Sequence, residues 1–342
     1  MGKNLNFYNI KGEKMKKKWT WLLAILTLAS LMLWSACSNN SSVESGSEQT
    51  SEAMGDEPLS QDLVYEEKAD GVYVKINPNV KDSITAVEIP ATYNGKTVVG
   101  IADLGFEYCS QLREVSLPTN LKKIGERAFF NCPLQTLVLP DTIQEIKDEA
   151  FSWCNQLQSV ILSDVLETLG DGAFRYCSSL QKVVLPDSLI SVGERAFAYC
   201  QNLREITIGE SLEEIGADAF LETPSIQKVI YTGELSNWCI IQFGSKLSNP
   251  ISVSGNLFDA EGEITELILD ENTTDILKFA FAGWTALQRV VLPKSILSIE
   301  YNAFDGCSGV KEVVYQGTAD EWTSVSFVEG GNTVIKNKVT FN

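Results

Sequence analysis

Apolar residues recur along most of this chain in an order that repeats about every 23 residues. The clearest reference point is a phenylalanine preceded by alanine or, once, by glycine. Successive phenylalanines are 23, 22, 23, 23 and 23 residues apart, and then 61 and 23 residues apart. They are Phe106, Phe129, Phe151, Phe174, Phe197, Phe220, Phe281 and Phe304. A period this regular predicts a solenoid of stacked repeats.

Each repeat follows the pattern L-x-x-V-x-L-P-x-x-L-x-x-I-G-x-x-A-F-x-x-C. Alternating apolar positions in its first half predict a short β-strand. The proline that follows ends this strand, because proline cannot donate a hydrogen bond to a sheet. The G-x-x-A-F segment is expected to reverse the chain through a turn or a short 3₁₀ or helical segment. Because one unit cannot bury its own apolar face, we expect neighbouring units to stack and their strands to pair in parallel.

These residues resemble the leucine-rich repeats of the BspA-like, or treponemal-type, family of microbial surface proteins. A second motif supports the resemblance: Tyr231-Thr232-Gly233 with Trp238 recurs as Tyr315-Gln316-Gly317 with Trp322. The resemblance implies a leucine-rich-repeat solenoid over about residues 62–342, with a Tyr-Gly-Trp insert at about 231–262 and a cap at about 315–342. We interpret Trp238 as part of a break in the stack. The family further implies a non-enzymatic, adhesin-like surface protein.

The N-terminal segment has the pattern of an export signal. Three lysines, Lys16 to Lys18, precede an apolar run that ends at Trp34, and Ser35-Ala36-Cys37 follows. This order predicts a secretory signal over residues 1–37. Cys37 resembles the lipidated cysteine of a bacterial lipobox, although Trp34 stands where leucine is usual; an uncleaved anchor or simple secretion are the alternatives. Residues 38–61 are rich in serine and acids and predict a flexible tether.

Charge and residue usage exclude several functions. The net charge is −18, and the part after residue 36 carries −23 because the first 36 residues hold six Lys and one Glu. Such an acidic surface disfavours nucleic acid and anionic membranes as partners. The chain has no histidine, so it lacks the most common general base and zinc ligand. We therefore expect no enzyme, no metal and no cofactor, and membrane contact only through a lipid anchor.

Six of the eight cysteines occupy one repeat position, three residues after the phenylalanine. They are Cys109, Cys132, Cys154, Cys177, Cys200 and Cys307. Stacked repeats would bring neighbouring Cα atoms to about 5 Å, within disulfide range. Side chains in one column point the same way, however, which favours a ladder of small buried thiols over disulfides.

Two columns depart from a purely polar exterior. The first is the strand position between the two inward residues, and it includes Val138, Ile161, Val184 and Ile230, with Val291 and Val314 further along. β-Branched residues suit any strand, but an exposed stripe of them would mark an interaction site. The second lies two residues after the phenylalanine and holds Tyr108, Trp153, Tyr176 and Tyr199. These rings either shield the cysteine column or form a platform for sugar or peptide.

The sequence therefore predicts a membrane-anchored lipoprotein on a bacterial cell surface that binds host or microbial proteins through the solenoid. The rival hypothesis is a glycan-binding lipoprotein that uses the aromatic column. A third is a structural component of the envelope. The pattern does not identify the ligand.

Overall fold

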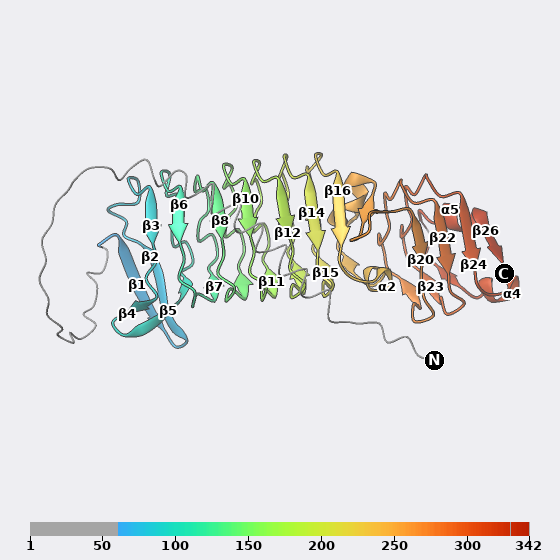
Figure 1. Ribbon diagram of the computed structural model, residues 1–342, viewed down its shortest axis with the longest axis horizontal. Coiled ribbons are helices and arrows are strands. Elements are labelled where there is room, and N and C mark those ends of the chain that lie inside the picture. The colour runs from blue at the N-terminus through green and yellow to red at the C-terminus, as the bar shows by residue number, and fades with distance from the viewer. Residues whose placement is uncertain (1–60, 329, 342) are drawn as a thin grey trace, which may run out of the picture. The chain divides into compact units, whose positions relative to one another are not determined.

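The computed structural model describes residues 61–328 and 330–341, which form a solenoid of stacked coils (Figure 1). Each regular coil contributes one strand to a first sheet and a shorter strand to a second sheet. Successive coils pair in parallel and in register, as where Leu137 lies opposite Val160. The predicted leucine-rich-repeat solenoid with short parallel strands is confirmed.

The first sheet has seven strands in the order β19-β18-β16-β14-β12-β10-β8. Its strands are β8 (Thr136–Val138), β10 (Ser159–Ile161), β12 (Lys182–Val184), β14 (Glu205–Ile208), β16 (Lys228–Tyr231), β18 (Leu257–Phe258) and β19 (Glu263–Ile264). A separate pair, β3 (Ala86–Glu88) and β6 (Glu114–Ser116), precedes it.

The second sheet has ten strands and begins with an antiparallel hairpin that covers the N-terminal end of the stack. Its strands are β1 (Leu63–Lys68), β2 (Gly71–Ile76), β4 (Thr92–Tyr93), β5 (Lys96–Ile101), β7 (Lys123–Ile124), β9 (Glu145–Ile146), β11 (Thr168–Leu169), β13 (Ser191–Val192), β15 (Glu214–Ile215) and β17 (Gln242–Phe243).

The ten-stranded sheet ends at β17 and the seven-stranded sheet at β19, and the last coils form two new sheets. One contains β20 (Glu266–Ile268), β22 (Arg289–Leu292), β24 (Glu312–Tyr315) and β26 (Val339–Phe341). The other contains β21 (Asp275–Ile276), β23 (Ser298–Ile299) and β25 (Ser326–Phe327). Residues 61–341 also include five short helices, which are α2 (Leu235–Trp238), η1 (Lys246–Ser248), α3 (Ile251–Ser254), α4 (Ala319–Trp322) and α5 (Thr333–Lys338).

The core lies between the two sheets and follows the repeat pattern. In β8, Leu137 is buried while Thr136 and Val138 are exposed, because successive side chains of a strand point to opposite faces. The phenylalanines from Phe106 to Phe220 are fully buried and stack in one ladder, with ring centroids 5.2 to 5.6 Å apart. The periodic phenylalanine is thus the centre of every coil.

The segment around each phenylalanine is a chain of turns rather than a helix. In one coil, Phe197 N donates to Ala219 O of the next coil, while Ala198 N donates back to Arg195 O. Arg195 and Tyr199 both have a left-handed backbone, with φ of 53° and 64°. The preceding glycine is required by close packing: a Cβ at Gly193 would lie 2.5 Å from Asp171 N of the previous coil.

The Tyr-Gly-Trp segment at 231–262 forms an enlarged coil. β17 pairs with β15 and β18 pairs with β16, so the segment extends both sheets. Both sheets also end here: β17 is the last strand of the ten-stranded sheet, and β19 folds back antiparallel to β18 and closes the edge of the seven-stranded sheet. The C-terminal segment repeats this design, because β25 pairs with β23 and β26 with β24. Trp238, at the end of α2, therefore lies in the coil at which both sheets end.

Within the part of the chain that the structure describes, no helix has the length and apolar character needed to cross a bilayer. The expected signal segment, Cys37 and almost all of the expected tether lie outside the described residues.

Candidate binding surfaces

Three of the four predicted aromatic residues form one continuous stack. The ring centroids of Trp153 and Tyr176 are 4.0 Å apart, and those of Tyr176 and Tyr199 are 4.5 Å apart. We call these three residues the aromatic pile. Tyr108 stands apart, because Asn131 occupies the intervening coil, and it contacts Phe130 edge to face. The sequence itself places Asn131 at this repeat position between Tyr108 and the other three residues.

Stacking changes what the pile offers to a ligand. Each ring covers a face of its neighbour, so Tyr176 and Tyr199 are half-buried while Trp153 remains 43 % exposed. The faces between stacked rings are unavailable, and the ring edges, the tyrosine hydroxyls and the two outermost faces remain. The pile therefore both shields the core and presents a surface, which combines the two interpretations that the sequence left open.

The backbone of the pile is unfavourable for aromatic residues. Trp153, Tyr176 and Tyr199 have φ of 64°, 61° and 64°, in the left-handed region. We call the coils after residue 264, which contain β20 to β26, the second stack. There the same repeat position is occupied by Gly283 and Gly306, and glycine is the residue that a left-handed backbone favours. A left-handed residue with a side chain costs roughly 1–2 kcal/mol, and an aromatic pair returns only about 0.5–1.5 kcal/mol. Stacking thus offsets most of this cost without requiring aromatic residues here.

Arg175, which the sequence pattern did not single out, lies beside the pile. Its guanidinium carbon is 4.9 Å from the centroid of Tyr176 and 5.9 Å from that of Tyr199. The position directly after the phenylalanine is buried in neighbouring coils, at Ser152 and Ala198. The Arg175 stem therefore starts beneath the pile, and its charged end emerges next to the rings. The sequence signal was an arginine at a position that is otherwise mostly uncharged.

The outward strand column forms an apolar stripe on the seven-stranded sheet, made of Val138, Ile161, Val184 and Ile230. Val138 and Val184 are 51 % and 47 % exposed, while Ile161 and Ile230 are half-buried. Strand register places Val138 opposite Ile161, and Thr207 opposite both Val184 and Ile230. The stripe therefore spans five strands, with Thr207 of β14 interrupting its apolar residues.

The stripe does not extend through the second stack. Val291 and Val314 are only 5 % and 7 % exposed, contrary to the outward position that alternation predicts. Ile268, at the same strand position in β20, is 58 % exposed, so the burial is confined to β22 and β24. Arg289 of the adjacent column bridges Glu266 at 3.3 Å and Glu312 at 2.9 Å, as Lys182 bridges Glu205 beside the exposed Val184.

The column of cysteines consists of free, buried thiols, as the sequence favoured. Every thiol of the column after Cys109 donates to a carbonyl of the preceding coil, as Cys154 Sγ does to Phe129 O at 3.2 Å. Burial raises the pKa of Cys154 and Cys200 to about 12 and that of Cys177 well above its ordinary value. These thiols are therefore structural groups that stay protonated at neutral pH.

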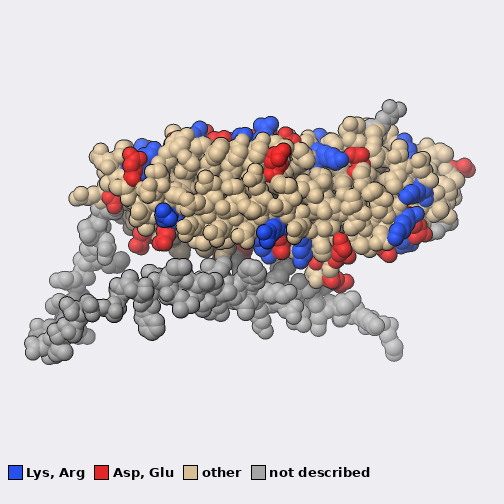
Figure 2. Space-filling view, turned by 90° about the horizontal axis from the view of Figure 1, so that it is seen from above, with Lys and Arg blue, Asp and Glu red and all other residues tan. Residues whose placement is uncertain are grey.

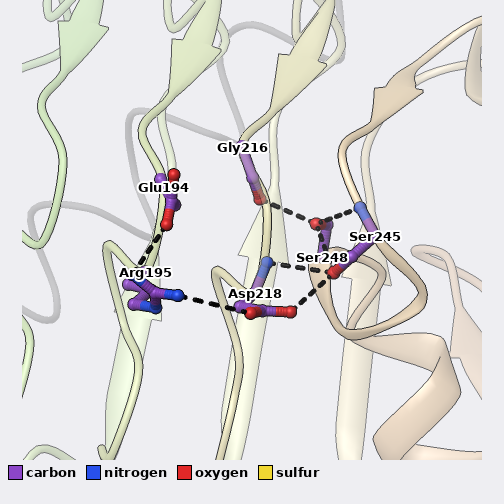
Figure 3. Close-up of polar contacts among 6 residues, drawn as sticks. All are labelled: Glu194, Arg195, Gly216, Asp218, Ser245 and Ser248. Atoms are coloured by element: carbon purple, nitrogen blue, oxygen red, sulfur yellow. Dashed lines mark hydrogen bonds and ion pairs between the residues drawn. The ribbon is translucent and has the colours of Figure 1, made fainter.

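A polar network joins the last regular coil to the enlarged coil (Figure 3). Ser245 Oγ donates to Asp218 Oδ1 at 2.9 Å and accepts from Asp218 N at 3.0 Å. Ser248 Oγ donates to Gly216 O at 2.7 Å and accepts from Ser245 N at 2.9 Å. Arg195 contacts both Glu194 and Asp218. The network satisfies the backbone groups that face the irregular coil, so we assign it a structural role.

The other side of the enlarged coil holds the second stack. Trp238 Nε1 donates to Ala280 O at 2.6 Å, and Asn249 Nδ2 donates to Phe279 O and Ala280 O at 2.8 Å. A polar groove of about 390 Å³ lies at this junction, lined by Glu214, Gln242, Phe243, Gly244, Leu277, Lys278 and Glu300. No cluster of metal-ligating side chains occurs among the residues described.

Comparisons with known proteins agree with this architecture. The family model of the BspA type leucine rich repeat region matches residues 80–180, 167–248 and 251–337. This chain belongs to the BspA-type leucine-rich repeat family. No curated protein matches this BspA-type chain.

This BspA-type protein is similar to several solved structures of leucine-rich repeat proteins. A leucine-rich repeat protein from Bacteroides ovatus is 21 % identical, with 84 % of this chain and 78 % of that one covered, at a TM-score of 0.47. The T. pallidum leucine-rich repeat protein is 22 % identical, with 75 % and 91 % covered, at a TM-score of 0.40. A leucine rich cell surface protein from Faecalibacterium prausnitzii is 23 % identical, with 73 % and 64 % covered, at a TM-score of 0.32.

Proposed function

We propose that this BspA-type protein is a non-enzymatic, adhesin-like binding protein on a bacterial surface. It engages host or microbial proteins through the outer face of the seven-stranded sheet. A lipid on Cys37 holds it at the membrane, and the residues that follow separate the solenoid from the bilayer. The basic, apolar and small-residue pattern of residues 16–37 supports export and anchoring.

The apolar stripe carries this proposal. Parallel sheets are normally covered on both faces, yet here Val138 and Val184 remain about half exposed on a face that no helix of residues 61–341 covers as a layer. Contiguous exposed apolar residues that are rimmed by polar groups mark protein interaction sites. The rim is present as the Lys182–Glu205 ion pair in the adjacent column. A partner that buries the stripe gains hydrophobic free energy, and the charged rim sets its register.

The test is a binding screen followed by a matched pair of variants. The chain from residue 38 would be immobilised and exposed to extracellular-matrix proteins and to proteins from other bacterial surfaces. For any saturable partner, Val184→Lys is expected to weaken binding at least tenfold, because it buries an unpaired charge in the contact. Ile190→Lys is the control, since Ile190 is 43 % exposed beside β13 of the ten-stranded sheet. An equal loss of affinity in Val184→Lys and Ile190→Lys, or the absence of any saturable partner in the screen, would count against the proposal.

The second candidate is glycan binding along the aromatic pile. One observation favours it: Trp153 is 43 % exposed at the end of the pile, where its outer face is not covered by another stacked ring. Trp153→Ala would abolish binding on a glycan array if this candidate is right. Unchanged array binding by this variant would eliminate it.

A further inference from the structure

Arg175 has no carboxylate partner in the described part of the chain, unlike Arg127 and Arg195. It differs from the equally unpaired Arg113 and Arg204 because its guanidinium lies against aromatic rings. Arg127, for comparison, contacts Glu107 at 2.6 Å and Glu149 at 3.7 Å. No acidic side chain among the described residues forms an ion pair with Arg175, although the chain has 45 acidic and only 27 basic residues. Its charge is met only by the rings of Tyr176 and Tyr199. A charge left unpaired amid excess acid is available to an anionic ligand.

Two buried polar atoms next to the pile also have no partner. Ser152 is 1 % exposed and its Oγ makes no hydrogen bond, and the Nε of Arg175 is likewise buried and unpartnered. The two residues hold the same repeat position in successive coils, which stack roughly 4.8 Å apart. Buried polar groups are nearly always hydrogen-bonded, so these two positions have hydrogen-bonding capacity that the described residues do not use.

The surrounding turns are neutral and rich in hydrogen-bonding groups. The positions that follow the cysteines are Asn155, Gln156, Ser178, Ser179, Gln201 and Asn202, all exposed or half-buried. These turns lead into β10, β12 and β14 along the upper edge of the solenoid in Figure 1. Figure 2 views this edge and shows broad uncharged areas between scattered charged side chains. Aromatic rings, one arginine and small neutral polar groups also make up adaptable binding surfaces elsewhere.

We propose that this edge binds a carboxylated sugar, with its carboxylate on the Arg175 guanidinium. Arginine accommodates a carboxylate through two parallel hydrogen bonds. The neutral amides and hydroxyls then meet the sugar hydroxyls, and the edges of the pile contact its C–H face. A sulfated polyanion or an anionic membrane would need clustered cations, whereas one arginine in an acidic protein suits one negative charge per ligand. The proposal rests on the second candidate function, glycan binding, and specifies its ligand class.

The test uses the chain from residue 38 and three probes: 3′-sialyllactose, a trisaccharide of galacturonic acid, and lactose. Binding is measured by calorimetry at low and physiological salt. The acidic probes are expected to bind, to weaken as salt rises, and to lose at least tenfold in affinity with Arg175→Gln. Arg175→Lys keeps the charge but not the paired hydrogen-bonding geometry, so its affinity for the acidic probes should lie between those of the unchanged protein and of Arg175→Gln. Arg113→Gln removes the same charge from a distant exposed position and should leave the affinity for all three probes unchanged. The folding of each variant is checked by circular dichroism.

The outcomes separate the two ideas. If lactose binds as tightly as the acidic probes, or if Arg175→Gln matches Arg113→Gln, the carboxylate site is refuted while glycan binding survives. If no sugar binds, both fall, and the sheet-face proposal is untouched. If an acidic peptide competes more strongly than either acidic sugar, the ligand class proposed here is wrong.

Discussion

The phenylalanine ladder provides a quantitative test of how the solenoid is held together. Phe174 stacks on two rings, at 5.2 Å to Phe151 and 5.6 Å to Phe197, whereas Phe106 has a single stacked partner at 5.2 Å. Both side chains are fully buried. Replacing either by leucine removes a similar apolar volume, so the difference between the variants isolates one ring pair.

We expect Phe106→Leu to lower the free energy of unfolding by roughly 1–2 kcal/mol, the usual cost of a modest change of shape in a core. Phe174→Leu should cost about 0.5–1.5 kcal/mol more, because a stacked aromatic pair is worth that amount beyond the area it buries. The central position should therefore be the more sensitive one, even though both residues have the same burial.

The assay is urea denaturation followed by circular dichroism, with the midpoint compared at equal m-values. Equal m-values matter, because repeat stacks can unfold in parts and a changed slope would signal that. Costs for the two variants that agree within about 0.3 kcal/mol, the usual error of such comparisons, would refute the reasoning. Burial alone, and not ring stacking, would then stabilise the ladder.

Three further predictions concern the thiols, the enlarged coil and the anchor. Because the folded pKa of Cys154 and Cys200 is raised to about 12, their contribution to stability is complete below the unfolded thiol pKa of about 8.5 and decreases as the pH rises toward 12. The denaturation midpoint should therefore decrease as the pH is raised above about 8.5, and it should decrease less steeply in Cys154→Ala. A midpoint that stays constant up to about pH 10.5 would contradict this. Trp238→Phe should lower the free energy of unfolding by roughly 2–3 kcal/mol, because it removes a hydrogen bond and leaves a cavity. Trp322→Phe, at a half-buried site, should lower it by less than about 1 kcal/mol. Both are measured by thermal denaturation, and equal losses would argue against different roles of the two modules. Cys37→Ala should release the protein from bacterial membranes on fractionation, and continued membrane association would exclude lipid anchoring.

The sequence pattern was most informative where one coil repeats the next. Stacking in register brings residues of the same repeat position together, so a fixed period identifies the phenylalanine ladder, the thiol column and the outward strand column without any coordinates. It also identified the two Tyr-Gly-Trp modules as copies of one element, because both contain the same seven-residue step from tyrosine to tryptophan.

What the sequence alone determined is the scaffold: the repeat length, the buried columns and the position of the strands. Only the tertiary structure decided which outward positions remain open, because that depends on side chains from other columns and other coils. Val291 and Val314 are buried although they alternate like Val138. Trp153 and Tyr176 cover each other's faces. Both long sheets end at the enlarged coil, where β17 is a last strand and β19 reverses direction. Arg175 lies beside the pile although Ser152 and Ala198, at the same position of the neighbouring coils, are buried. Periodicity specifies the neighbours along each column, whereas exposure is set by what lies across it.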